Sequence, residues 1–175
     1  MKRTITFAML TLLLFFGIFT CRSWAENINS TGTEKTQALN KEDVYTIADD
    51  FSKCAGNMYA FAEISKLYPE LQNTVLTSNN TANAWKYGAA WVLYSSETIK
   101  DFKAALGYAG SQTEQTYRSW LAAFETNDKQ VLEKDIDKLG VAMSFCGEAY
   151  GELQLEMTNQ IKRFLYENMP EEMPE

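Results

Sequence analysis

A long apolar seam in the C-terminal third of the chain constrains its fold more than any other feature. Between residues 132 and 164, apolar side chains recur in alternating steps of four and three, the spacing of one face of an α-helix. The seam consists of Leu132, Ile136, Leu139, Met143, Cys146, Tyr150, Leu153, Met157 and Phe164, with Ile161 on the same side. Because other helices must cover such a face, the sequence predicts an all-α, roughly antiparallel four-helix bundle.

Cys146 lies in the middle of this seam, and Cys54 lies in the middle of an earlier amphipathic helix. A disulfide needs Cα atoms about 5.5 Å apart, whereas helix axes usually pack about 8–10 Å apart, so the two backbones must approach closely. The small residues Ala55, Gly56 and Gly147 beside the cysteines would permit this approach. We therefore predict that a Cys54–Cys146 disulfide staples two helices together; the alternative is two inert buried thiols.

The N-terminus has the pattern of a secretory signal peptide. Lys2 and Arg3 precede an apolar run from Ile5 to Phe19. After this run, Ser23-Trp24-Ala25 places small residues at positions −3 and −1 of a cleavage point. We expect cleavage near Ala25, which would deliver the chain to the oxidising bacterial periplasm. Two alternatives stay open: an uncleaved membrane anchor, and a lipoprotein acylated at Cys21, which the bulky residues before that cysteine disfavour.

Removal of residues 1–25 would leave a strongly acidic protein. The whole chain has 16 Lys and Arg against 23 Asp and Glu, and the removed segment carries three of the basic residues and no acid. The mature charge is then 13 basic minus 23 acidic residues, or −10. This charge argues against a nucleic-acid partner and would attract a basic protein, although solubility alone also explains it. We expect no stable membrane insertion after cleavage.

Three parts should make up the mature chain. Residues 26–39 are rich in Asn, Ser, Thr and Gly and predict a flexible N-terminal lead-in. Residues 40–168 predict the helical bundle domain. The acidic segment 169–175 contains two prolines and predicts a disordered tail.

Capping signals place the first two helices within the bundle domain. Asn40, followed by two acidic residues, should cap the first helix, and Pro69 should end it at Tyr68. The second helix should span about 82–108, with Gly110 just beyond it as a terminator.

The third helix should be short and the fourth long. Ser111 and Glu114 open the third helix in capping-box spacing. Asn127-Asp128 should cap the fourth, with Gln130 three residues after Asn127 completing a second box. A helix continuing from there to Asn168 would be about 60 Å long, well beyond its partners. We therefore expect a bend or break near Gly140 or Gly151.

The chain contains no histidine, which removes the commonest chemistry of enzymes and metal sites. Without it there is no usual general base at neutral pH, no Ser-His or Cys-His pair and no histidine ligand for haem or di-iron. A row of glutamates at Glu148, Glu152 and Glu156 could bind a cation, but its position off the apolar seam favours a solvated helix face. We expect no catalytic residue, no metal and no cofactor.

The candidate functional surface is the aromatic side of the second helix. If Trp85 faces the core, steps of about 100° per residue place Tyr87, Trp91 and Tyr94 near the opposite side. Either these three residues bind a partner, or the third helix covers them with Tyr117, Trp120 and Phe124.

These patterns favour an exported, non-catalytic protein that acts by protein–protein binding, in the manner of chaperones, inhibitors or immunity proteins. The alternative is a carrier of an apolar small ligand, with Trp85, Trp91 and Trp120 lining a cavity between helices. A binding protein should expose an apolar patch, a carrier should enclose a cavity, and an enzyme should bring carboxylates together in a cleft.

Overall fold

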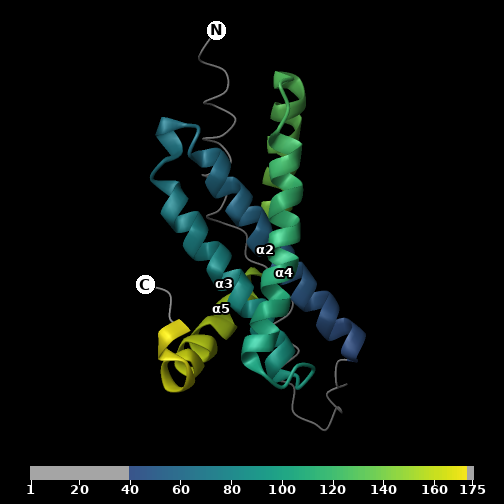
Figure 1. Cartoon of the computed structure of the whole chain (residues 1–175), viewed down its shortest axis with the longest axis vertical. Coiled ribbons are helices and arrows are strands. Elements are labelled where there is room, and N and C mark those ends of the chain that lie inside the picture. The colour runs from purple at the N-terminus through teal and green to yellow at the C-terminus, as the bar shows by residue number, and fades with distance from the viewer. Residues whose placement is uncertain (1–39, 173–175) are drawn as a thin grey trace. The chain divides into compact units, whose positions relative to one another are not determined.

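The structure is a computed structural model that describes residues 40–172. Over these residues it is all-α, and Figure 1 shows its four helices. They are α2 (Lys41–Ser65), α3 (Thr74–Ser95), α4 (Phe102–Phe124) and α5 (Lys129–Asn168), with short 3-10 helices η3 (Pro69–Leu71) and η4 (Pro170–Glu172). The expected signal peptide with Cys21, the expected lead-in 26–39 and residues 173–175 lie outside the described residues.

Helix α2 is the centre of the packing, since its contacts with α3, α4 and α5 are together more extensive than those of any other described helix. Asn40 caps it as predicted, because the Asn40 Oδ1 atom accepts a hydrogen bond of 2.9 Å from the Asp43 N–H. Small residues allow neighbouring helices to approach α2 or its side chains closely. A Cβ atom on Gly56 would lie 2.6 Å from Thr116 Cβ of α4, and one on Gly88 of α3 would lie 2.8 Å from the Phe51 ring.

The predicted boundary between the second and third helices is wrong. Helix α3 begins at Thr74 and ends at Ser95, and α4 is a full helix of 23 residues starting at Phe102, so there is no short third helix. Glu97 adopts a left-handed conformation with φ of 57°, and Asp101 caps α4 by accepting a 2.7 Å hydrogen bond from the Ala104 N–H. This cap starts a new helix that continues through Gly110, the residue interpreted from sequence as a terminator.

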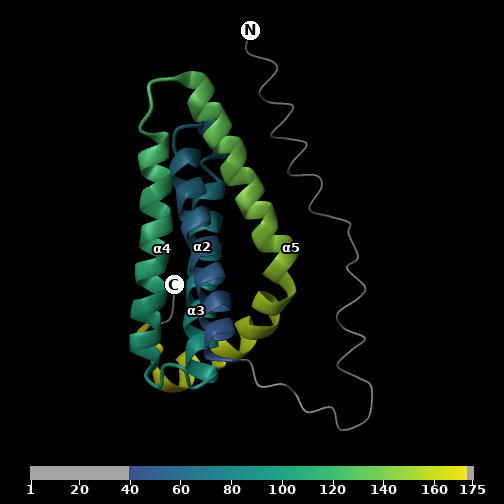
Figure 2. The same ribbon diagram turned by 90° about the vertical axis from the view of Figure 1, so that its right-hand side faces the viewer.

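Helix α5 is continuous over 40 residues and passes through Gly140 and Gly151 without a break. Figure 2 shows that it curves. Its first part lies beside α2, to which Cys146 joins it, and its last part reaches the beginning of α4, where the Phe164 and Phe102 rings are 5.0 Å apart. Of the two predicted outcomes, the helix bends and does not break.

The curvature divides the predicted apolar seam into two buried stretches. Leu139 and Cys146 are buried on the first part of α5, and Met157 and Ile161 are buried on the last part. Leu153, which belongs to the same predicted seam, is 39% exposed. It lies between the stretch that packs on α2 and the stretch that packs on α3 and α4.

The chain after α5 continues against the helices for a few residues. Met169, the first residue of the expected disordered tail, is buried, and η4 follows it. Glu171 lies 3.9 Å from Lys103 of α4 in an exposed ion pair. None of the described helices has the length and apolar character needed to cross a membrane.

Candidate functional site

The Cys54–Cys146 disulfide joins α2 to α5, as predicted. The two sulfur atoms are bonded at 2.04 Å, the Cα atoms lie 5.7 Å apart, and both cysteines are buried. The glycines beside them have other roles than the one predicted. Gly147 is exposed and Gly56 faces α4. Neither glycine therefore lies between α2 and α5, so neither one permits their close approach at the disulfide.

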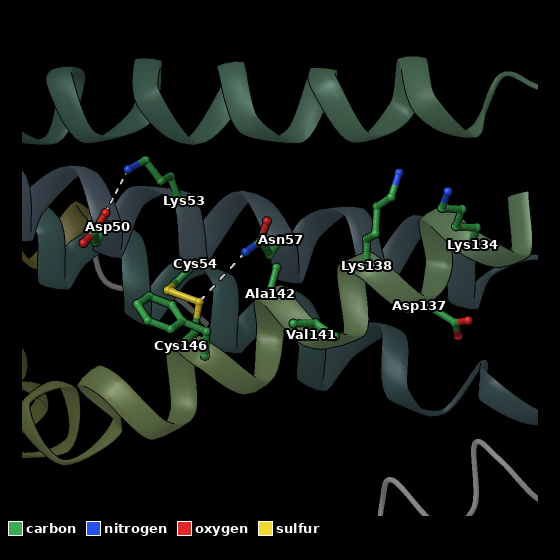
Figure 3. Close-up of a pocket in the computed structure, with 11 residues that line it drawn as sticks. Asp50, Lys53, Cys54, Asn57, Lys134, Asp137, Lys138, Val141, Ala142 and Cys146 are labelled. Carbon is green, nitrogen blue, oxygen red and sulfur yellow. Dashed lines mark hydrogen bonds and ion pairs between the residues drawn. A yellow bond between two sulfur atoms is a disulfide. The ribbon is translucent and has the colours of Figure 1, made fainter. Parts of the chain in front are cut away.

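An open groove of about 680 Å³ lies beside this disulfide, between α2 and the first part of α5. Figure 3 shows Cys54 and Asn57 of α2 on one side of it, and Ala142 and Val141 of α5 on the other. Most of the lining surface is apolar. The lining residues are Asp50, Lys53, Cys54, Asn57, Lys134, Asp137, Lys138, Val141, Ala142, Phe145 and Cys146.

The apolar wall of the groove is contributed by α5. Val141 is 72% exposed and Phe145 is 55% exposed, and their spacing of one helical turn places them on the same face. Isolated exposed apolar residues are common on protein surfaces, but neighbouring ones that border a groove indicate a contact surface. Neither residue belongs to the predicted seam.

Hydrogen bonds fix one end of the groove. The Asp50 carboxylate accepts hydrogen bonds of 2.8 Å from both the Lys53 ammonium and the Tyr150 hydroxyl, which ties α2 to α5 one turn beyond the disulfide. Burial, together with the hydrogen bond and the charge of Asp50, raises the pKa of Tyr150 to about 12. The phenol is therefore neutral at ordinary pH, and its ring lies 6.1 Å from the Phe145 ring.

Asn57 connects the other side of the disulfide to α4. Its Nδ2 group lies 3.9 Å from Cys146 Sγ, as a weak hydrogen bond to sulfur, and its Oδ1 atom accepts a 2.7 Å hydrogen bond from the Trp120 indole N–H. Asn57 is buried, so both contacts are protected from water. The groove is consequently held by three helices although two line it.

The rim of the groove carries both signs of charge. Lys53 pairs with Asp50, and Lys138 pairs with Asp135 at 2.6 Å. Lys134 and Asp137 complete the charged rim. Because these charges are of both signs and lie at the solvent-accessible rim, they give the groove little preference for a charged partner of either sign. The apolar wall therefore dominates what the groove can bind.

The aromatic residues predicted as a partner-binding surface lie elsewhere. Tyr87, Trp91 and Tyr94 are partly buried on α3. The Trp91 and Tyr94 rings lie 5.3 Å and 5.1 Å from the Phe164 ring of α5. Phe164 of α5 thus covers part of Trp91 and Tyr94, and Phe102 of α4, whose ring is 5.6 Å from the Tyr94 ring, covers part of Tyr94 as well.

The glutamate row identified in the sequence and the acidic pair Asp49 and Asp50 of α2 have different surroundings. Glu148, Glu152 and Glu156 are exposed along α5. Asp49 is engaged, because it accepts a 2.8 Å hydrogen bond from the Tyr108 hydroxyl, just as Asp50 accepts one from Tyr150. Within residues 40–172 no three Cys, Asp or Glu side chains are grouped as a metal site would require.

Comparison of the chain with models of protein families, with curated protein sequences and with solved structures gives no match.

Proposed function

We propose that this chain is an exported, non-catalytic binding protein of the bacterial periplasm, built on a roughly antiparallel bundle and acting in the manner of a chaperone, inhibitor or immunity protein. The groove beside the Cys54–Cys146 disulfide is its binding site. The observation that carries this proposal is the pair of exposed apolar side chains, Val141 and Phe145, on the wall of an open and mostly apolar groove.

An amphipathic helix of a partner protein is the occupant that suits this groove. The groove runs between two helices, and an inserted helix presents apolar side chains at the same one-turn spacing as Val141 and Phe145. The net charge of about −10 expected for the mature chain favours a basic polar face on that helix, because long-range attraction speeds the encounter.

Two 18-residue model helices test this proposal, one made of leucine and lysine and the other of leucine and glutamate. Fluorescence anisotropy should detect binding of the leucine–lysine helix, and the double variant Val141→Asp/Phe145→Asp should weaken it at least about tenfold. The control is Leu155→Asp/Tyr166→Asp, which adds the same charge at positions of α5 that are 68% and 75% exposed and do not line the groove.

The melting temperatures of both variants should stay close to that of the unmodified protein, since exposed substitutions change stability by about 0.5 kcal/mol or less. Equal affinity of the groove variant and the control variant would refute the site. Tighter binding of the leucine–glutamate helix would keep the groove and reject the basic partner.

The alternative function, carriage of an apolar small molecule, draws support from the size of the groove, since about 680 Å³ is within the range of small-ligand sites. Against it, the groove is open and not enclosed. Dodecanoate distinguishes the two functions: saturable binding of one equivalent, lost in the Val141→Asp/Phe145→Asp variant, together with no binding of either model helix, would favour the carrier.

Export has a separate test. Protein produced from the full-length sequence in a bacterial host should be recovered from the periplasmic fraction with Glu26 as its first residue. An intact mass that retains residues 1–25, or one that carries lipid on Cys21, would contradict cleavage near Ala25.

A further inference from the structure

The face of α5 that points away from the other helices carries a regular pattern of its own, which we call the outer stripe. Figure 2 shows α5 along one edge of the bundle. Eight positions between residues 131 and 155 follow one another in alternating steps of three and four, so they share one face of the helix. All eight side chains are exposed. The outer stripe consists of Val131, Lys134, Lys138, Val141, Phe145, Glu148, Glu152 and Leu155.

The outer stripe is complementary to itself when a second copy runs in the opposite direction. A two-fold axis at the level of residue 143 would bring together positions that lie equally far before and after that residue. Each pair formed in this way is either apolar with apolar or lysine with glutamate. The pairs are Val131 with Leu155, Lys134 with Glu152, Lys138 with Glu148, and Val141 with Phe145.

The spacing and the charges together select the antiparallel direction. Alternating steps of three and four are the spacing by which two helices pack along a common seam. A parallel pair in register would place Lys134 against Lys134 and Glu148 against Glu148 of the other copy, and like charges in contact are unfavourable. The antiparallel pair instead places each of these charges against an opposite one.

The apolar members of the stripe are unusual for a face that meets only water. Within residues 40–172, eight large apolar side chains are exposed, and four of them belong to the stripe. Their exposed fractions are 44% for Val131, 72% for Val141, 55% for Phe145 and 68% for Leu155. Apolar residues that gather on one exposed surface indicate a contact with another protein.

The charged members of the stripe are available for pairing. Lys134, Glu148 and Glu152 have no ion-pair partner within the described part of the chain, and Lys138 pairs with Asp135 of its own helix. The excess of 23 acidic over 16 basic residues in the whole chain opposes self-association. At physiological salt, however, charges further apart than about 8 Å are largely screened, so the contacting pairs outweigh this repulsion.

We propose that two copies of this chain form an antiparallel dimer through the outer stripe of α5. Cys146 lies three residues from the level of the two-fold axis, so the disulfide to α2 supports the centre of the interface. The dimer buries Val141 and Phe145 and thereby covers the apolar wall of the groove, so a partner helix must compete with the second copy. This last consequence rests on the proposed function, whereas the dimer does not.

Sedimentation equilibrium of the unmodified protein should show a monomer–dimer equilibrium at micromolar concentrations. The charge-reversal variants Lys134→Glu/Lys138→Glu and Glu148→Lys/Glu152→Lys should each dimerise at least about tenfold more weakly, because every ion pair becomes a like-charge pair. An equimolar mixture of the two variants should dimerise again, since all lysine–glutamate pairs then re-form between unlike copies. The matched control, Lys41→Glu/Lys100→Glu, changes the charge equally at exposed lysines outside α5 and should leave the dimer unchanged.

Cross-linking with a carbodiimide, which condenses a lysine amine with a carboxylate, identifies the pairs. Lys134 and Glu152 lie about 27 Å apart along one helix, so an amide bond between them must join two copies. Mass spectrometry of the cross-linked dimer should find this link and the link from Lys138 to Glu148.

The outcomes separate the dimer from the proposed function of the groove. A protein that stays monomeric, variants that do not recover on mixing, or cross-links that join other residues would overturn the dimer. A monomer that still binds the leucine–lysine helix would keep the groove and reject the dimer. A dimer that recovers on mixing, in a protein that binds neither model helix even when the charge-reversal variants are used alone, would keep the dimer and reject the proposed function.

Discussion

Removal of the disulfide by the double substitution Cys54→Ala/Cys146→Ala should cost a large part of the stability of this domain. The two cysteines are 92 positions apart in the sequence. In the chain-entropy model a closed loop of that length restricts the unfolded chain by about 4–5 kcal/mol, against a total of about 5–15 kcal/mol for a typical domain. We expect a loss of this size in the free energy of unfolding.

The loss should be uneven along α5. Its first part is held to α2 by the disulfide and by the hydrogen bond from Tyr150 to Asp50, whereas Met157, Ile161 and Leu165 are buried on its last part. Amide hydrogen exchange in residues 129–150 should therefore accelerate far more than exchange in residues 155–166.

Urea unfolding followed by circular dichroism measures the total, and hydrogen exchange read by mass spectrometry measures its distribution. The oxidised protein and the reduced, alkylation-free protein are the controls, because reduction removes the bridge without removing the sulfur atoms. A loss below about 1 kcal/mol, or equal acceleration along all of α5, would refute the role assigned to the disulfide.

Three further predictions follow from contacts in the helices. Gly56→Ala should destabilise the protein by about 1–3 kcal/mol in urea unfolding, because the added Cβ would overlap α4. The control Gly107→Ala should be neutral or stabilising by up to about 1 kcal/mol, because its Cβ meets no other atom. Equal effects of the two substitutions would contradict the close approach of α2 and α4. Trp91→Ala should cost about 1–3 kcal/mol, less than a fully buried tryptophan, because its ring is partly buried; an unchanged melting temperature would return this residue to the list of binding candidates. Tyr108 and Tyr150 have pKa values raised from 10 to about 12, so their contribution to stability is present below pH 10 and is lost as the pH rises to 12. Replacing either tyrosine with Phe should therefore reduce the fall in melting temperature between pH 10 and pH 12. A fall of unchanged size would contradict the hydrogen bonds from these tyrosines to Asp49 and Asp50.

The sequence predicts the parts of this fold that depend on local spacing. The periodic seam of residues 132–164 predicts one long helix, and the central positions of Cys54 and Cys146 on two amphipathic faces predict their pairing. The boundary between α3 and α4 was missed because two local signals compete there. The cap at Asp101 prevails over the helix-breaking tendency of Gly110, and periodicity does not show which one wins.

The candidate site was harder to predict, because it depends on contacts between distant segments. Val141 and Phe145 are visible in the sequence as two apolar residues one turn apart and off the seam. Their exposure, however, depends on which part of α5 other helices cover, and that depends on the curve of α5. The same curve brings Phe164 onto Trp91, a contact between residues far apart in the chain that local spacing does not encode.

The separation of 92 positions between the bridged cysteines also has a consequence for the order of folding. Helices α2, α3 and α4 follow one another through short connections, so their contacts can form early, whereas the contacts of α5 with α2 close a long loop and should form late. The groove exists only after this last step, because α5 supplies its apolar wall. In a chain that is still reduced, the first part of α5 would be held less firmly against α2, so formation of the disulfide would complete the proposed binding site.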